Sequence, residues 1–375
     1  MRERPEKSPT VRVRSGSGQT GPVDEAATPG PARSDLPLID VGPLVEDGNR
    51  PVSSDEAGPE PGLDAVATAI DEACRRDGFF LVTGHGVDLA LLESLDSAAR
   101  DFFAMPETAK AAVAMVHGGR AWRGWFPEGG ELTSGRPDHK EGFYFGAELP
   151  AGHPRVRAGV PLHGPNVFPT RPVELRELVL RWIDQMTALG HALVRGIGLG
   201  LGLDGGWFDR HLTADPTVLF RIFRYPARPA GDDGWGVAEH TDYGLLTILA
   251  TDGSSGLQIR RDEDWVDVPV VPDAFVVNIG DMLDRMTGGR YRSTPHRVRH
   301  TASTAGSDRL SFPFFFDPGW DVEVLPIPLP SPAPADNAPI RWDRSSVHEW
   351  SGTYGDYLTA KVSKVFPDLR AEHLG

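Results

Sequence analysis

The sequence has almost no cysteine, no long apolar run and no surplus of basic residues, and each deficit excludes a class of protein. Cys74 is the single cysteine among 375 residues, so an internal disulfide cannot form and thiolates alone cannot build a metal site. Any bound metal must therefore be held by nitrogen and oxygen ligands. We expect Cys74 to be a buried structural thiol.

Apolar runs are too short for a membrane protein. None approaches the roughly 18 consecutive apolar residues that a membrane span needs, and no apolar segment follows the charges at the N-terminus. The formal net charge of −15 opposes binding to a polyanion. We therefore expect a cytoplasmic protein with neither a membrane nor a nucleic acid as partner.

Three regions of the chain differ in composition. Residues 1–34 are rich in Arg, Ser, Gly, Pro and Thr, so they cannot bury enough apolar surface to fold, and we expect a disordered tail. Residues 35–170 mix helical and strand patterns, whereas residues 171–375 begin with a long helical pattern and continue with many short strands. We expect these last two regions to form one structural unit.

The apolar spacing predicts a mainly β fold with flanking helices. Helical spacing predicts helices over 63–76, 89–103, 106–116, 172–203 and 349–366. Short apolar or alternating runs predict strands over 36–40, 79–82, 218–225, 244–250, 256–259, 274–279 and 310–316, and loops are expected over 46–62 and 329–339. Many short strands at this spacing indicate a sandwich or barrel rather than alternating βαβ units.

One local pattern has the chemistry of a metal site. In a strand, residues two apart point to the same face, so His240 and Asp242 could present a nitrogen and a carboxylate oxygen to one ion. His296 lies in another strand-like run, which sheet folding could bring beside the first pair. Two histidines and one carboxylate leave adjacent coordination positions open, which is typical of non-haem iron(II) oxygenases. Taken alone, a His-X-Asp pair is more often an ordinary surface or core pair.

A second pattern follows on the chain. Arg309 and Ser311 again share one face of an expected strand, where the Arg can grip a carboxylate with two parallel hydrogen bonds and the Ser adds a donor. An arginine that precedes an apolar strand is otherwise commonly a solvated edge residue. Together the two patterns indicate a carboxylate clamp near a metal.

Short motifs spread from about residue 36 to residue 369 match one known family. They are Leu36 to Asp40, Gly78 to Gly86, Asp138 to Glu141, Asn166 to Pro169, Tyr225 and Pro226, His240 to Asp242, Asn278 to Asp281, His296 to Val298, and Arg309 to Ser311. On these motifs the chain resembles the isopenicillin N synthase-like family of iron(II)/2-oxoglutarate-dependent dioxygenases. The resemblance implies a double-stranded β-helix, a jelly roll of the cupin kind. It also implies an enzyme that uses iron(II), 2-oxoglutarate and dioxygen to oxidise a small molecule.

The resemblance assigns roles residue by residue. His240, Asp242 and His296 would bind the iron. The distal carboxylate of 2-oxoglutarate would be bound by Arg309, Ser311 and Tyr225. Many plant members have Asn two positions before this Tyr, whereas this chain has Phe223. Hydroxylation would be the default outcome, with desaturation or cyclisation as alternatives, and we expect a role in specialised metabolism such as antibiotic biosynthesis.

Strand parity extends the expected site into a substrate pocket. Counting in steps of two from Arg309 reaches Phe315, and counting back from Tyr225 reaches Phe223 and Arg221, so these three are candidates for the cavity wall. For the two phenylalanines an ordinary place in the core is an equal alternative. The segments 120–131 and 141–145 are candidates for a lid.

Two further functions stay open at this point. The first is an iron oxidase of the same fold that needs no 2-oxoglutarate, in which the Arg-X-Ser pair binds the carboxylate of the substrate itself. The second is a jelly-roll binding module without catalysis, which the complete set of three metal-ligand candidates disfavours.

Overall fold

The structure is a computed structural model that describes residues 35–48, 61–133, 135–228, 235–299, 307–330, 347–366 and 371. The expected tail over 1–34 and most of the two expected loops over 46–62 and 329–339 lie outside these residues.

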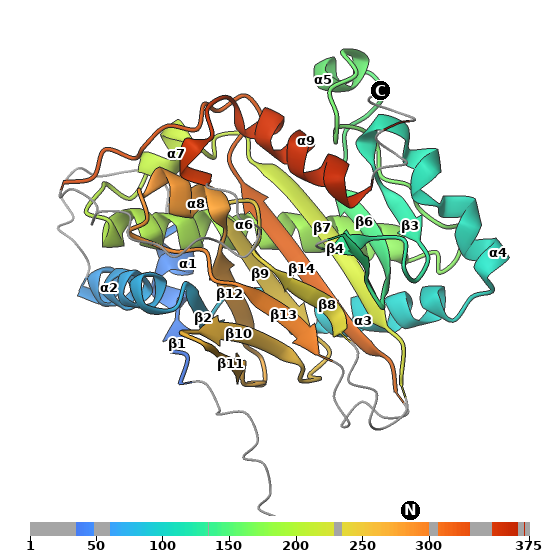
Figure 1. Ribbon diagram of the computed structural model, residues 1–375, viewed down its shortest axis with the longest axis horizontal. Helices are drawn as coiled ribbons and strands as arrows, with labels where there is room; N and C mark the ends of the chain where they lie inside the picture. Colours follow the sequence, from blue (N-terminus) through green and yellow to red (C-terminus); the bar gives the residue numbers. More distant parts are fainter. Residues whose placement is uncertain are drawn as a thin grey trace, which may run out of the picture.

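Two β-sheets form the centre of the molecule (Figure 1). The larger sheet has the strand order β1-β2-β12-β9-β14-β7-β6-β3 and the smaller has the order β11-β10-β13-β8. The larger sheet consists of β1 (Leu38–Asp40), β2 (Phe79–Thr83), β3 (Gly124–Phe126), β6 (Glu141–Gly146), β7 (Thr217–Tyr225), β9 (Leu246–Thr251), β12 (Phe275–Ile279) and β14 (Arg309–Asp317). The smaller consists of β8 (Trp235–His240), β10 (Leu257–Arg261), β11 (Asp264–Asp267) and β13 (His296–Arg299), and a hairpin joins β4 (Leu132–Thr133) to β5 (Arg136–Pro137).

Residues of both sheets line one cavity of about 370 Å³. The two open sheets confirm the expected mainly β class with flanking helices, and strands β1, β2, β3 and β6 extend the larger sheet with segments from the N-terminal part of the chain. The division into regions 35–170 and 171–375 stays a prediction.

Helices cover the face of the larger sheet that points away from the smaller one (Figure 1). The long helix α6 (Leu175–Gly200) packs so closely on this sheet that a Cβ at Gly190 would lie 2.4 Å from the ring of Phe316. Helices α2 (Pro61–Arg76) and α3 (Leu89–Phe103) contact α6 in turn. Cys74, on α2, is free and buried, as expected.

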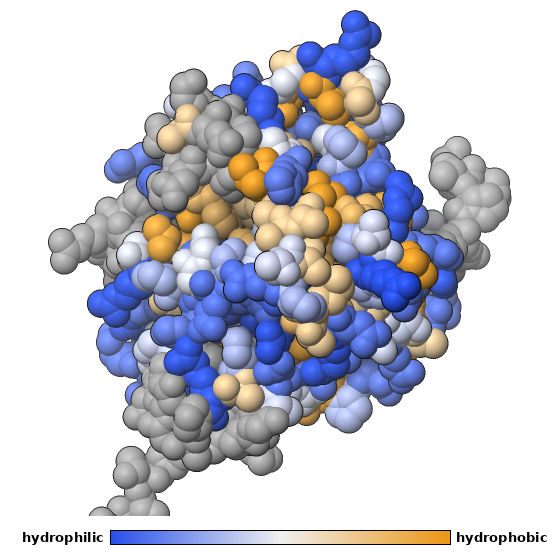
Figure 2. Space-filling model, turned by 90° about the vertical axis from the view of Figure 1, so that its right-hand side faces the viewer, coloured by the Kyte–Doolittle hydropathy of each residue, from blue (hydrophilic) through white to orange (hydrophobic). Residues whose placement is uncertain are grey.

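The remaining helices are short, apart from α9. They are α1 (Gly42–Gly48), α4 (Glu107–Lys110), α5 (Pro154–Arg157), α7 (Trp207–His211) and α8 (Asp281–Met286), with 3-10 turns over Ala111–Val113, Met115–Ala121 and Val347–Glu349. Helix α9 (Tyr354–Val365) contributes residues to the wall of the cavity. None of the helices in the described ranges is long and apolar enough to cross a bilayer. One side of the molecule shows a band of hydrophobic residues between larger hydrophilic areas (Figure 2).

Two expectations about the N-terminal region were wrong. The continuous helix expected over 106–116 is broken at Ala114, whose backbone is extended and forms a β-bridge with Trp125, so tertiary pairing overrides the local helical pattern. The segment 141–145 is not a lid but part of β6, a buried strand of the larger sheet. Of the other expected lid segment, Glu131 reaches the cavity.

Candidate functional site

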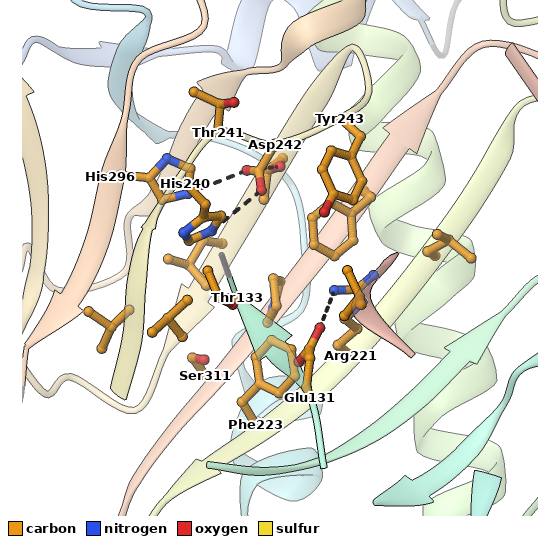
Figure 3. Close-up of a pocket in the computed structure, with 18 of the residues that line it drawn as sticks. Glu131, Thr133, Arg221, Phe223, His240, Thr241, Asp242, Tyr243, His296 and Ser311 are labelled. Atoms are coloured by element: carbon orange, nitrogen blue, oxygen red, sulfur yellow. Dashed lines mark hydrogen bonds and ion pairs between the residues drawn. The ribbon is translucent and has the colours of Figure 1, made fainter. Parts of the chain in front are cut away.

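Three side chains from two strands and a turn converge inside the cavity (Figure 3). His240 is the last residue of β8 and lies directly opposite His296, the first residue of β13, in the antiparallel register. Asp242 follows in the turn after β8, not on the strand, so the expected reason for its position was wrong although the convergence is as expected. One ligand atom from each of the three residues lies within 4.8 Å of the other two.

Backbone carbonyls fix the orientation of both imidazoles. Nδ1 of His240 lies 2.8 Å from the carbonyl oxygen of Ala238, and Nδ1 of His296 lies 3.1 Å from that of Thr294. A carbonyl can only accept, so each Nδ1 carries the proton and each Nε2 keeps its lone pair. Both Nε2 atoms face Asp242, at 3.9 Å from Oδ1 for His240 and 3.7 Å from Oδ2 for His296. This is the arrangement that metal-binding histidines commonly have.

The carboxylate of Asp242 is held by two further side chains. Its Oδ2 accepts hydrogen bonds from Thr247 Oγ1 at 2.5 Å and from Asn278 Nδ2 at 2.8 Å. Thr247 and Asn278 are direct neighbours on β9 and β12 of the larger sheet. The two sheets are therefore joined through the candidate metal site.

Burial and mutual proximity decide the protonation of this cluster. Burial, and then the neighbouring imidazole of His296, lower the pKa of His240 to about 4, so that its ring is neutral at pH 7. Burial opposes ionisation of Asp242, but the two imidazoles and the hydrogen bonds from Asn278 and Thr247 hold its pKa below the ordinary value. Two neutral imidazoles and one carboxylate are the donor set that suits iron(II).

Arg309 is the second unusual feature of the cavity. It is only 4% exposed, yet its Nε and Nη1 have no hydrogen-bond partner within the described part of the chain. The register places Arg309 opposite Tyr225, and the guanidinium carbon lies 4.8 Å from the centre of the Tyr225 ring. Because a buried guanidinium without acceptors is costly, this geometry fits an anionic ligand that completes the site.

The other expected residues line the same cavity. Ser311 is opposite Phe223 in the β7–β14 register, and Arg221 and Phe315 also lie on the cavity wall. The period-two argument therefore placed all of these side chains on one face of the two strands.

Sequence reasoning missed a group of charged and polar residues on the cavity wall. Glu131, at the start of the β4–β5 hairpin, accepts a hydrogen bond from the Tyr144 hydroxyl, and Nζ of Lys140 lies 2.9 Å from its Oε2. Lys140 also pairs with Asp138. Asp138 and Lys140 belong to a motif that carried the resemblance, but nothing in their spacing shows that they meet Glu131.

Comparisons with known proteins agree with this geometry. Residues 36–171 match the family model described as non-haem dioxygenase in morphine synthesis N-terminal, and residues 216–318 match that of the 2OG-Fe(II) oxygenase superfamily. A Dictyostelium discoideum protein named probable iron/ascorbate oxidoreductase is 44% identical over 328 residues, which cover 81% of this chain and 90% of the relative. The chain belongs to the 2-oxoglutarate/iron(II) oxygenase superfamily.

Two further relatives support the assignment of this oxygenase. The 2-oxoglutarate-dependent dioxygenase citB of Monascus ruber is 34% identical over 309 residues, covering 78% of this chain and 87% of the relative. The crystal structure of a full-length Neurospora crassa protein in complex with alpha-KG has a TM-score of 0.70 and 25% identity, covering 88% of this chain and 96% of that one. The fold is thus the jelly roll of these oxygenases. The protein is a 2-oxoglutarate-dependent iron(II) dioxygenase, with dioxygen as the second co-substrate, that oxidises a small molecule.

Proposed function

We propose that His240, Asp242 and His296 bind the iron(II) of this oxygenase. The observation that carries the proposal is the orientation of the two histidines, whose Nδ1 atoms are engaged by backbone carbonyls while both Nε2 atoms face the Asp242 carboxylate. A metal held by these three residues would keep coordination positions for 2-oxoglutarate and dioxygen. When bound, the ion and its co-substrates replace a C–H bond of the substrate by C–OH, while 2-oxoglutarate becomes succinate and carbon dioxide.

Arg309, Ser311 and Tyr225 form the proposed site for the distal carboxylate of 2-oxoglutarate. The unsatisfied, buried guanidinium of Arg309 supports this role. The charges also balance, because iron(II) with Asp242 carries about +1 and the dianion with Arg309 carries about −1. A neutral assembly can be buried at much lower cost than any of its parts.

The remaining assignments complete the proposal. Arg221, Phe223 and Phe315 are proposed to contact the substrate. Hydroxylation is the proposed outcome, and a role in specialised metabolism fits the comparison with citB, whereas antibiotic biosynthesis in particular stays a prediction. The cytoplasmic location and the lack of a nucleic-acid or membrane partner also stay predictions.

Anaerobic titration tests the proposed sites. Iron(II) added with 2-oxoglutarate should give the visible charge-transfer band of a chelated keto acid in the wild-type protein. Arg309→Ala should weaken 2-oxoglutarate binding by roughly 30-fold to several thousand-fold, equivalent to about 2 to 5 kcal/mol, because the carboxylate loses its partner. Asp242→Ala should abolish the band, since the metal loses its only anionic protein ligand.

The control is Arg181→Ala, which removes an exposed arginine from α6 and should leave the band unchanged. An unchanged 2-oxoglutarate affinity in Arg309→Ala would contradict the carboxylate site. Iron binding without a 2-oxoglutarate band, and without succinate formation in air, would favour the iron oxidase, and lack of iron binding would favour the binding module.

A further inference from the structure

A second arginine in the cavity has one acidic neighbour at a long distance and, within the described residues, a buried N–H without an acceptor. Arg221 lies on β7, its side chain is 15% exposed, and its Nε is buried without a hydrogen-bond partner in the described part of the chain. Its nearest acidic group is Glu131, whose Oε1 is 3.5 Å from Nη1, which is too long for a good hydrogen bond. The guanidinium lies over the rings of Tyr144 and Phe315, with 4.1 Å and 4.7 Å from its carbon to the ring centres. The two rings hold the planar guanidinium in place, and its Nε–H has no acceptor among the described residues.

Glu131, by contrast, has one hydrogen-bond donor and one close cation, although its Oε2 accepts no hydrogen bond within the described residues. It accepts the hydroxyl hydrogen of Tyr144, and the buried ammonium group of Lys140 lies 2.9 Å from its Oε2. Burial opposes the charge on Glu131, but Lys140 and Arg221 hold its pKa below the ordinary value, so it is ionised. Glu131 already faces two cationic side chains, Lys140 and Arg221, whereas Nε of Arg221 has no acceptor among the described residues, which favours an anionic ligand over a cationic one.

The position of Arg221 separates it from the proposed co-substrate site. Tyr225 is opposite Arg309 in the β7–β14 register, and Arg221 is four residues earlier on β7. At about 3.3 Å per residue the two backbone positions are about 13 Å apart along the strand. Arg221 therefore lies further along the cavity wall than the proposed carboxylate site at Arg309.

Other parts of the cavity wall indicate the rest of the ligand. Lys361 and Lys364 on α9 line the same cavity and add positive potential. The apolar and aromatic members of the same wall include Leu219, Phe223, Tyr243, Phe315 and Leu358. This combination suits a molecule with an apolar body and one acidic end.

We propose that Arg221 binds a carboxylate of the primary substrate through its two-pronged guanidinium edge, so that the substrate of this oxygenase is a small acid with an apolar or aromatic body. Glu131 is the resting counter-ion of Arg221, and on substrate binding it keeps Lys140 and Tyr144 as its partners. This inference rests on the proposed function, because it assigns the substrate class of that site.

Matched probes test the charge preference directly. Phenylacetate, 3-phenylpropionate and 4-phenylbutyrate are each titrated by anaerobic calorimetry against their uncharged amides and the corresponding amines, with iron(II) and saturating 2-oxoglutarate present. In the wild-type protein the best acid should bind at least tenfold more tightly than its amide. Arg221→Gln should weaken acid binding by roughly 30-fold or more without changing amide binding. Arg221→Lys should give an intermediate value, since it keeps the charge but loses the planar fork.

A second variant should act in the opposite direction. Glu131→Gln removes the competing anion and keeps one oxygen that can accept the Tyr144 hydroxyl, while Lys140 keeps its ion pair with Asp138, so acid affinity should rise several-fold. A general loss of folding cannot mimic this gain. The control Arg181→Gln, on an exposed part of α6, should match the wild-type protein.

Three results would overturn the inference. The first is that the wild-type protein binds acids and amides with equal affinity. The second is that Arg221→Gln still prefers acids. The third is that the wild-type protein binds the amines most tightly and that Glu131→Gln loses this amine binding. The visible 2-oxoglutarate band is recorded in the same samples and should persist in Arg221→Gln. Lack of this band in the wild-type protein would instead refute the proposed function, while calorimetry still measures the acid preference and its dependence on Arg221.

Discussion

At the scale of single residues, the position of Asp242 depends on two neighbours that lie outside the proposed set of metal ligands. Asn278 and Thr247 both donate to Oδ2, which fixes the rotation of the carboxylate in a turn that has no strand pairing of its own. Asn278→Ala should therefore lower iron(II) affinity by about 10- to 100-fold while the protein remains folded. Anaerobic iron(II) titration, with circular dichroism to verify folding, measures this effect.

Gln185→Ala is a suitable control for that experiment, because Gln185 lies on α6 and accepts a backbone hydrogen bond from Asp88 at the start of α3. It should leave iron affinity unchanged. Equal iron affinities in the Asn278 variant and the wild-type protein would show that the carboxylate keeps its orientation without the amide.

Single residues also show what the sequence could and could not predict about the site. The convergence of His240, Asp242 and His296 was predictable because their residue types and order match a known pattern, and the cavity wall followed from strand parity. The ion pair of Glu131 with Arg221 could not be predicted from the sequence. The β4–β5 hairpin brings the two residues together, and its strands are too short to leave a periodic pattern in the sequence.

At the scale of elements, the turn after β8 and the start of α8 meet at two glycines. A Cβ at Gly280 would lie 2.5 Å from the carbonyl oxygen of Gly244 and 2.9 Å from its nitrogen, and backbone atoms cannot move aside as a flexible side chain could. The backbone NH of Asp281 donates to the carbonyl of Asp242 at 2.8 Å in the same region. Close contact between these segments therefore holds the turn that carries Asp242.

Gly280→Ala should push the two segments apart. We expect a loss of about 1 to 3 kcal/mol in the free energy of unfolding, as for other overpacked sites, together with weaker iron(II) binding. Urea denaturation and iron titration measure the two effects. Gly152→Ala is the matched control, because a Cβ there meets nothing within 4 Å and should change neither quantity. Full retention of iron affinity in Gly280→Ala would show that the Asp242 turn is held by other contacts.

Helices and strands with a strong hydrophobic periodicity in the sequence were predicted well. Helix α3 has the predicted bounds of Leu89–Phe103, β7 begins one residue before its predicted range, and β14 extends one residue beyond its predicted range at each end. The region 106–137 was predicted poorly, because its 3-10 turns and two- or three-residue strands are set by contacts with β6 and other neighbours and not by their own pattern.

At the scale of the whole molecule, the cavity joins parts of the chain that are far apart in sequence. Its wall takes Glu131 from the hairpin, Arg221 from β7, His296 from β13 and Lys361 from α9. Asp317, the last residue of β14, connects three of the surrounding elements. It accepts a hydrogen bond from the Tyr354 hydroxyl of α9 at 2.5 Å and one from the backbone NH of Leu245, before β9, at 3.0 Å.

Asp317 should make the stability of the molecule depend on pH. Burial, only partly offset by the hydrogen bonds from Tyr354 and Leu245, raises the pKa of Asp317 to about 7 from an ordinary value of 3.8. Between these two values the folded protein keeps a proton that the unfolded chain has released. The free energy of unfolding therefore falls as pH rises through this range and levels off above pH 7.

Asp317→Asn removes this dependence while the amide can still bond with both neighbours. From pH 5 to pH 8 the variant should gain about 2 to 3 kcal/mol in the free energy of unfolding relative to the wild-type protein, because the wild-type protein alone must ionise a buried group. Urea denaturation of the metal-free proteins at the two pH values measures the difference. Asp264→Asn, at an exposed position on β11, should follow the wild-type protein. A constant difference between Asp317→Asn and wild type across this range would mean that Asp317 does not titrate there and that α9 is held to the sheets in the same way at both pH values.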